Sequence, residues 1–98
     1  MAARDFQPLK SLLPGVLARL TRGSGSARAL GPVWEEAVGA VIARQARPWA
    51  WEGSRLVLRV TEARWLRELQ HQGPQLLGRV QASLGAQAPT ELLFRLAP

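Results

Sequence analysis

The stretch WAWEGSRLVLRV, residues 49–60, decides the fold, because apolar and polar residues alternate on both sides of a glycine-containing turn. This alternation is typical of two strands in a β-hairpin, and Gly53-Ser54 suits a tight type II′ turn. The predicted register pairs Glu52 with Arg55 and gives the hairpin a core face and an outer face. The core face is expected to hold Trp49, Trp51, Leu56, Leu58 and Val60. The outer face is expected to hold Ala50, Glu52, Arg55, Val57 and Arg59.

Two helices are predicted before the hairpin. Apolar residues recur with helical spacing over residues 9–20, with a bend expected at Pro14-Gly15, and again over residues 32–47. Pro32 suits the first turn of the second helix, and Pro48 ends it. We expect a flexible Gly-Ser-rich link between the two helices.

A third helix is predicted after the hairpin, over residues 61–84, because the apolar spacing continues through a bend at Gly73-Pro74. Residues 91–96 alternate again, which predicts a third strand. The sequence therefore predicts an α+β fold in the order α-α-β-β-α-β, with helices packed on one face of a three-stranded sheet. We expect one domain over residues 9–96 and a frayed segment at residues 1–8. The predicted core residues are Trp34, Gly39, Trp49, Trp51, Leu58, Trp65, Leu69, Leu77 and Phe94.

The composition excludes several classes of function. The 98 residues are 47% hydrophobic, which is enough for a core, and they include no cysteine and one histidine, His71. Disulfide scaffolds, thiol catalysis and multi-histidine metal sites are therefore excluded. Glu35 and Glu36 are adjacent and diverge by about 100° on a helix, so they do not form a catalytic pair. We expect no enzymatic activity, metal, cofactor or small-molecule substrate.

The sequence shows neither a leader-like segment nor an apolar run of membrane-spanning length, so we expect a cytoplasmic protein with no membrane partner.

The net charge of +6 favours an acidic partner, either a nucleic acid or an acidic protein surface. Most of the excess lies in residues 1–30, which hold five basic residues and one acidic residue. Arginine makes up 12 of the 13 basic residues, which suits phosphate contacts, although GC-rich codon usage explains the same bias. The arginines expected to contact nucleic acid are Arg19, Arg22, Arg28, Arg55, Arg59, Arg64 and Arg67.

The outer face of the sheet allows two interpretations. Its arginines and small apolar groups suit a single-stranded nucleic acid or a protein surface, but an ordinary solvated face with a Glu52–Arg55 pair fits equally well. The predicted register leaves this face without an aromatic side chain on which a base would stack. Arg64 and Arg67 have the same ordinary alternative on a helix surface, and Trp34 and Trp65 are expected to pack rather than to form binding hot spots. The residues expected to bind a protein partner are Val57, Leu93 and Arg95, with the helix at residues 9–20 as a further candidate.

The ordered apolar positions resemble those of the DciA family over about residues 9–96. They run from Trp34-x-x-x-Val38-Gly39-x-x-Ile42-Ala43 through Pro48 and Gly53-x-x-Leu56-x-Leu58-x-Val60 to Trp65-x-x-x-Leu69, Leu76-Leu77, Leu84-Gly85 and Phe94.

The resemblance implies a KH-like domain in a bacterial DNA replication protein. It also implies a protein that binds the DnaB-type replicative helicase and assists its loading on single-stranded DNA without being an ATPase. The Gly-x-x-Gly clamp of KH modules is missing from the link at Gly23-Ser24-Gly25. The sequence also ends at Pro98 without the long basic extension of many members, so we expect any DNA contact on the folded domain. A stand-alone KH-like RNA-binding module is the alternative.

Overall fold

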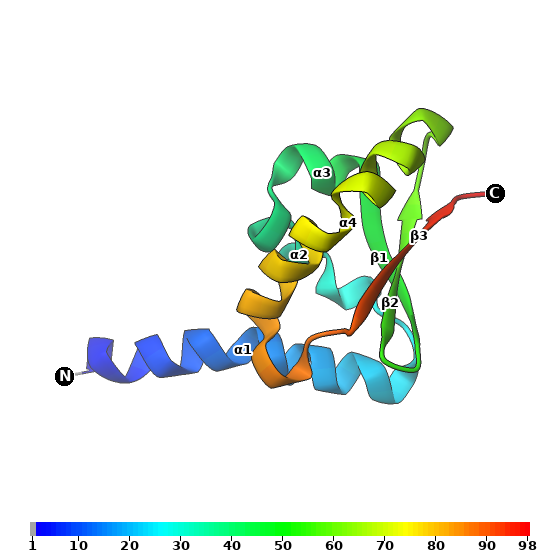
Figure 1. Cartoon of the computed structure of the whole chain (residues 1–98). Helices are drawn as coiled ribbons and strands as arrows, with labels where there is room; N and C mark the ends of the chain where they lie inside the picture. Colours follow the sequence, from blue (N-terminus) through cyan, green and yellow to red (C-terminus); the bar gives the residue numbers. More distant parts are fainter. Residues whose placement is uncertain (1) are drawn as a thin grey trace.

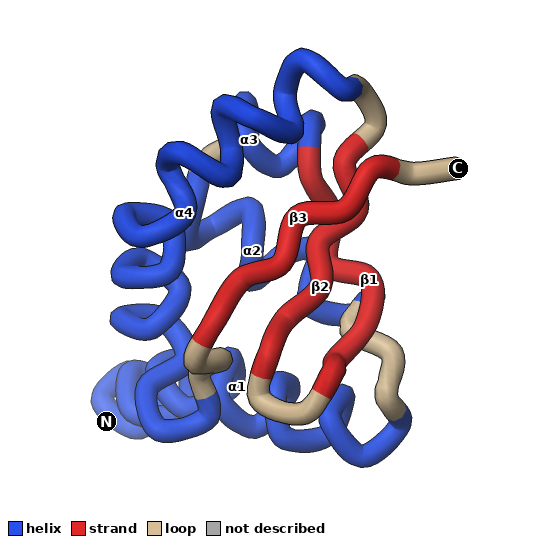
Figure 2. The backbone as a smooth tube through the Cα atoms, turned by 45° about the vertical axis from the view of Figure 1, so that its right-hand side comes forward, coloured by secondary structure: helices blue, strands red, loops and turns tan. Residues whose placement is uncertain are grey.

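A three-stranded sheet with helices packed on one face forms the α+β fold of the computed structural model, as predicted (Figure 1). The structure describes residues 2–98, with side chains from residue 13 onward. The strands are β1 (Ala46–Glu52), β2 (Arg55–Val60) and β3 (Glu91–Leu96), in the order β1-β2-β3. β1 and β2 are antiparallel, whereas β2 and β3 are parallel and are connected by a helix. Figure 2 shows the three strands side by side, with the helices beside and behind them.

The helix α1 (Ala2–Ser24) is continuous through Pro14 and Gly15, and its first turns extend beyond the rest of the molecule (Figure 1). The backbone of residues 2–8 belongs to this helix, and the expected domain limits, residues 9–96, stay a prediction. A short 3₁₀ turn, η1 (Arg28–Leu30), follows. The long helix α4 (Ala63–Leu84) contains Pro74 and is a single helix, as expected, before a second 3₁₀ turn, η2 (Gly85–Gln87).

The single helix predicted over residues 32–47 is wrong, because Gly39 divides it into α2 (Gly31–Val38) and α3 (Ala40–Gln45). Gly39 has φ +93° and ψ +162°, a conformation that is nearly closed to residues with a side chain. Gly39 is exposed, so its contribution is to the backbone path and not to the core in which we expected it. The break lets α3 turn toward β1, which begins at Ala46, directly after the last residue of α3.

The core between the helices and the sheet includes two indoles whose N–H groups are satisfied. Trp34 donates to the carbonyl oxygen of Ala46 at 2.8 Å, and Trp51 donates to the Thr21 hydroxyl at 3.0 Å. Thr21 in turn donates to the Ala18 carbonyl, so Trp51 ties the end of α1 to the sheet. Of the other expected core residues, Leu58, Leu69 and Phe94 are buried, whereas Trp65 and Leu77 are half-buried.

Trp49 does not lie on the core face, and this is the main correction to the predicted hairpin. The pairs Ala50–Val57, Trp51–Leu56 and Glu52–Arg55 follow the expected register, but Leu58 pairs with Pro48 instead of Trp49. Trp49 is the extra residue of a β-bulge between Pro48 and Ala50. Its side chain is 40% exposed, because the bulge interrupts the alternation and turns it to the outer face of the sheet.

Replacing Gly39 by alanine should lower the free energy of unfolding by about 1–3 kcal/mol, since an added Cβ disfavours its positive φ. The matched control is Gly78→Ala inside α4. A Cβ at either glycine would meet no atom within 4 Å, so the two variants differ in backbone conformation alone. The control should raise the free energy of unfolding by about 0.5–1 kcal/mol. Urea denaturation measures both, and an equal effect of the two substitutions would contradict the assigned role of Gly39.

Candidate nucleic-acid interface on the outer sheet face

Two arginines lie over the exposed indole of Trp49. The guanidinium carbon of Arg59 in β2 is 4.0 Å from the ring centroid, and that of Arg28 in η1 is 5.2 Å from it. Both distances are within the range of cation–π attraction, which contributes about 0.5–1 kcal/mol at an exposed site. We call Trp49, Arg28, Arg59 and the neighbouring Arg47 the Trp49 cluster.

Arg28 reaches this position because the chain before it is hydrogen-bonded to the free edge of β1. The amide of Trp51 donates to the Gly25 carbonyl at 2.9 Å, and the amide of Ala27 donates to the Trp49 carbonyl at 3.0 Å. The segment therefore behaves as a short extra strand, bridged from Ser26 to Ala50. It places η1 on the opposite side of β1 from β2, so the two arginines approach Trp49 from the two sides of its strand.

Arg47 stands directly opposite Arg59 in the β1–β2 ladder. Like charges at directly opposed positions repel each other, and a carboxylate would normally relieve the repulsion. Within residues 13–98, no ion pair joins Arg28, Arg47 or Arg59 to a carboxylate. The Trp49 cluster is thus a concentration of positive charge that a bound anion would stabilise.

Beside this cluster, an ion pair crosses the sheet diagonally and covers Val57. Arg95 in β3 donates to both carboxylate oxygens of Glu52 in β1, at 2.5 and 2.8 Å. Val57 lies midway between them in the register and is 4% exposed. Val57 is therefore buried and does not lie open on the sheet as expected, and Leu93 is half-buried. Partner binding by these residues stays a prediction.

The expected Glu52–Arg55 pair is replaced by two others, because β3 brings further charges to the sheet. Arg55 forms an ion pair with Glu91 at 3.2 Å, and Glu52 forms its pair with Arg95. Hydrogen bonding to Arg95 holds the pKa of Glu52 below the ordinary value of 4.5, and the same contact raises the pKa of Arg95.

Of the seven arginines predicted to contact nucleic acid, Arg28 and Arg59 meet at the Trp49 ring. Arg22 is half-buried: its guanidinium lies 4.3 Å from the Trp51 ring centroid and donates to the Ala88 carbonyl at 3.0 Å, so it has a structural role. Arg55 and Arg64 form ion pairs with Glu91 and Glu62. Arg19 on α1 and Arg67 on α4 are exposed and belong to other surfaces.

The sequence patterns indicated neither the position of Arg47 beside Arg59 nor the outward direction of Trp49. The available signal was Pro48, which lies inside β1 and not before it. Proline has no N–H group for the ladder, so within a strand it indicates an edge position or a bulge.

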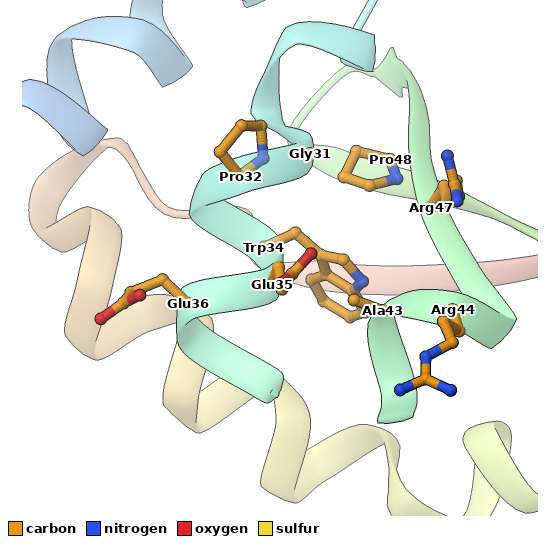
Figure 3. Close-up of a pocket in the computed structure, with 9 residues that line it drawn as sticks. All are labelled: Gly31, Pro32, Trp34, Glu35, Glu36, Ala43, Arg44, Arg47 and Pro48. Atoms are coloured by element: carbon orange, nitrogen blue, oxygen red, sulfur yellow. The ribbon is translucent and has the colours of Figure 1, made fainter. Parts of the chain in front are cut away.

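A depression of about 420 Å³ lies between α2 and the segment from α3 to β1 (Figure 3). Figure 3 shows Arg44 and Arg47 on one side, with Glu36 extending away from them. The lining includes no hydroxyl, thiol or imidazole group, and the Trp34 N–H is already bonded to Ala46. This depression therefore offers no hydroxyl, thiol or imidazole nucleophile. Its charged lining is two glutamates and two arginines, and it adjoins the Trp49 cluster through Arg47.

Two other kinds of site are absent from the part of the chain that the structure describes. No group of three or more histidine, cysteine, aspartate or glutamate side chains is arranged to hold a metal ion there. No helix of that part is long and apolar enough to cross a membrane.

The comparison with protein families gives one result that covers most of the chain. The model of the family described as "Dna[CI] antecedent, DciA" matches residues 8–94. The match includes β1, β2, α2, α3 and α4, most of α1, and β3 as far as Phe94. No curated protein matches the chain.

Replacing Glu52 by glutamine tests the ion pair that covers Val57. Since the pKa of Glu52 is lowered in the folded state, the pair stabilises the fold above pH 4.5 and stops doing so as the pH falls through the lowered pKa. The thermal midpoint of Glu52→Gln should lie below that of the original chain at pH 7, by a few degrees at most, and the difference should vanish on acidification. The control is Glu35→Gln, an exposed glutamate on α2. A difference that persists at low pH would contradict the assignment.

Proposed function

Because the chain belongs to the DciA family, we propose that it binds the DnaB-type replicative helicase and assists helicase loading on single-stranded DNA. The observation that carries this proposal is the family match over residues 8–94. The proposed role is non-enzymatic: the protein acts through contacts with the helicase and with the DNA. A cytoplasmic location in a bacterial cell is part of the same proposal.

The Trp49 cluster supports the nucleic-acid part of the proposal. Arginines that lack carboxylate partners among the described residues can contact phosphates without first breaking an ion pair. With only a few such side chains, binding should be weak and should decrease steeply with added salt. This suits a protein that hands DNA to a helicase rather than retaining it.

For the helicase contact, α1 is a better candidate than the outer sheet face. Leu13, Val16 and Leu20 follow helical spacing on one side of α1, and each is about half exposed or more. An exposed apolar stripe of this kind is typical of a helix that packs against a partner. Arg19 lies on the same helix, so a partner surface that is apolar with acidic residues at its rim would fit. The earlier candidates Val57 and Arg95 are covered and ion-paired.

A KH-like RNA-binding role is the second candidate, since an exposed tryptophan beside arginines suits single-stranded RNA as well as DNA. A salt titration that shows clear preference for RNA over single-stranded DNA, with no helicase complex, would favour it.

The double variant Leu13→Glu/Leu20→Glu should lower the affinity for the cognate helicase by about tenfold or more, because it places two charges in an apolar contact. Co-migration with the helicase over a range of concentrations measures this affinity. Loading of the helicase on a forked substrate should fall in parallel. Val41→Glu is the matched control, since Val41 is 62% exposed, close to 60% for Leu13 and 64% for Leu20, but lies on α3. Absence of any complex between the original chain and the helicase at micromolar concentration would overturn the proposal.

A further inference from the structure

Trp49 stands out among the tryptophans of this chain by its accessibility. Its side chain is 40% exposed, compared with 3% for Trp34 and 8% for Trp51, and Trp65 is half-buried against the core. A hollow of about 230 Å³ lies against it, also lined by Val57, Arg59, Arg95, Leu96 and Pro98. The ring therefore borders an accessible space with an apolar floor and a positively charged rim.

We propose that Trp49 stacks against one base of a single-stranded nucleic acid, while Arg28, Arg47 and Arg59 bind the adjoining phosphates. The inference rests on the nucleic-acid part of the proposed function and assigns it a site and a mode of contact. A base is a flat π surface, and stacking on an aromatic side chain is tolerant of sequence because every base has such a surface. The guanidinium groups of Arg28 and Arg59 lie over the ring, so a stacking base would displace one of them.

Replacing the arginine on the indole by a base favours binding, because the indole and the released guanidinium each gain a stronger contact. A base on the indole replaces an exposed cation–π contact, and the released guanidinium pairs with a phosphate. The repulsion between Arg47 and Arg59, which face each other across β1 and β2, is relieved at the same time. The bulge contributes directly, since it is the reason that the ring lies beside these arginines.

The geometry favours a single-stranded nucleic acid over the two other polyanions that the arginines would attract. An acidic peptide would pair with the guanidinium groups but would leave the indole without a partner. Duplex DNA keeps its bases stacked inside the helix, so only its phosphates would be contacted. A single strand alone uses both the ring and the charges. With three phosphate contacts, the logarithm of the binding constant should fall with the logarithm of salt concentration with a slope of about −2.

The test compares two single strands of equal length, oligothymidylate and the corresponding abasic strand. Trp49→Ala should lower affinity for oligothymidylate by about 5- to 150-fold, the range measured for loss of one stacked base, and should leave affinity for the abasic strand nearly unchanged. Trp49→Phe should keep most of the binding, since a smaller aromatic ring remains. Binding of oligothymidylate to the original chain should also change tryptophan fluorescence, and this change should be largely lost in Trp49→Phe.

Arginine variants test the phosphate contacts separately. Arg59→Gln and Arg47→Gln should weaken binding to both strands and reduce the salt slope, whereas Arg79→Gln, an exposed arginine on α4, is the matched control that should do neither. Thermal unfolding of every variant shows whether the fold is retained.

The possible results separate this inference from the proposed function. Equal affinity of the original chain for the two strands, or an unchanged affinity of Trp49→Ala for oligothymidylate, would overturn the stacking role. If the chain also binds an acidic peptide, and Trp49→Ala weakens that binding as much as it weakens binding of oligothymidylate, the choice of ligand would be overturned. Co-migration of Trp49→Ala with the helicase should match that of the original chain, because the stripe on α1 is unchanged. Loss of helicase binding by the original chain would contradict the proposed function and leave the stacking result standing.

Discussion

The β-bulge at Trp49 determines which side chains of β1 face the helices and which face outward. Pro48 and Trp51 are both buried, although a regular strand would place residues three positions apart on opposite faces. One extra residue between the paired positions resolves this conflict, and it is accommodated at an edge strand next to a proline that has no N–H to donate. The core then keeps the Trp51 indole, and the outer face gains that of Trp49. The position of Trp49 beside Arg28 and Arg59 follows from this single insertion.

Local patterns in the sequence were sufficient for the fold class and for several of its elements. The hairpin at Gly53-Ser54, the long helix through Pro74 and the last strand each show a periodicity that depends only on neighbouring residues. Periodicity was insufficient where one residue changes the direction of the chain. The break at Gly39 preserves the apolar stripe on both sides, so spacing alone describes one helix. The bulge preserves strand composition, so alternation alone places Trp49 in the core.

The candidate site was less predictable than the fold, because charge composition does not show which arginines have partners. Arg22 is held over Trp51 by tertiary packing, and Arg55 pairs with Glu91 only because β3 lies next to β2. The diagonal pair of Arg95 with Glu52 depends on the same placement. These contacts join residues far apart in sequence, so a segment-by-segment count of charge cannot reveal them. What remains after they are assigned is a smaller and better-defined set of arginines around one aromatic ring, which have no ion pair within residues 13–98.

The parallel pairing of β2 with β3 also constrains the order in which the chain folds. Positions that meet in this ladder, such as Arg55 and Glu91, are 36 residues apart, and the whole of α4 lies between them. The hydrogen-bonded pair Ser54 and Thr90, just before the ladder, has the same separation. Closing so large a loop before its contacts form is slow, whereas the hairpin and α4 are built from local contacts. Until β3 pairs, the edge of β2 that will face β3 has unpaired backbone groups beside an apolar face. Partly folded chains associate through surfaces of this kind. The pairing of β3 with β2 completes the sheet, and it is therefore the step at which aggregation competes with folding.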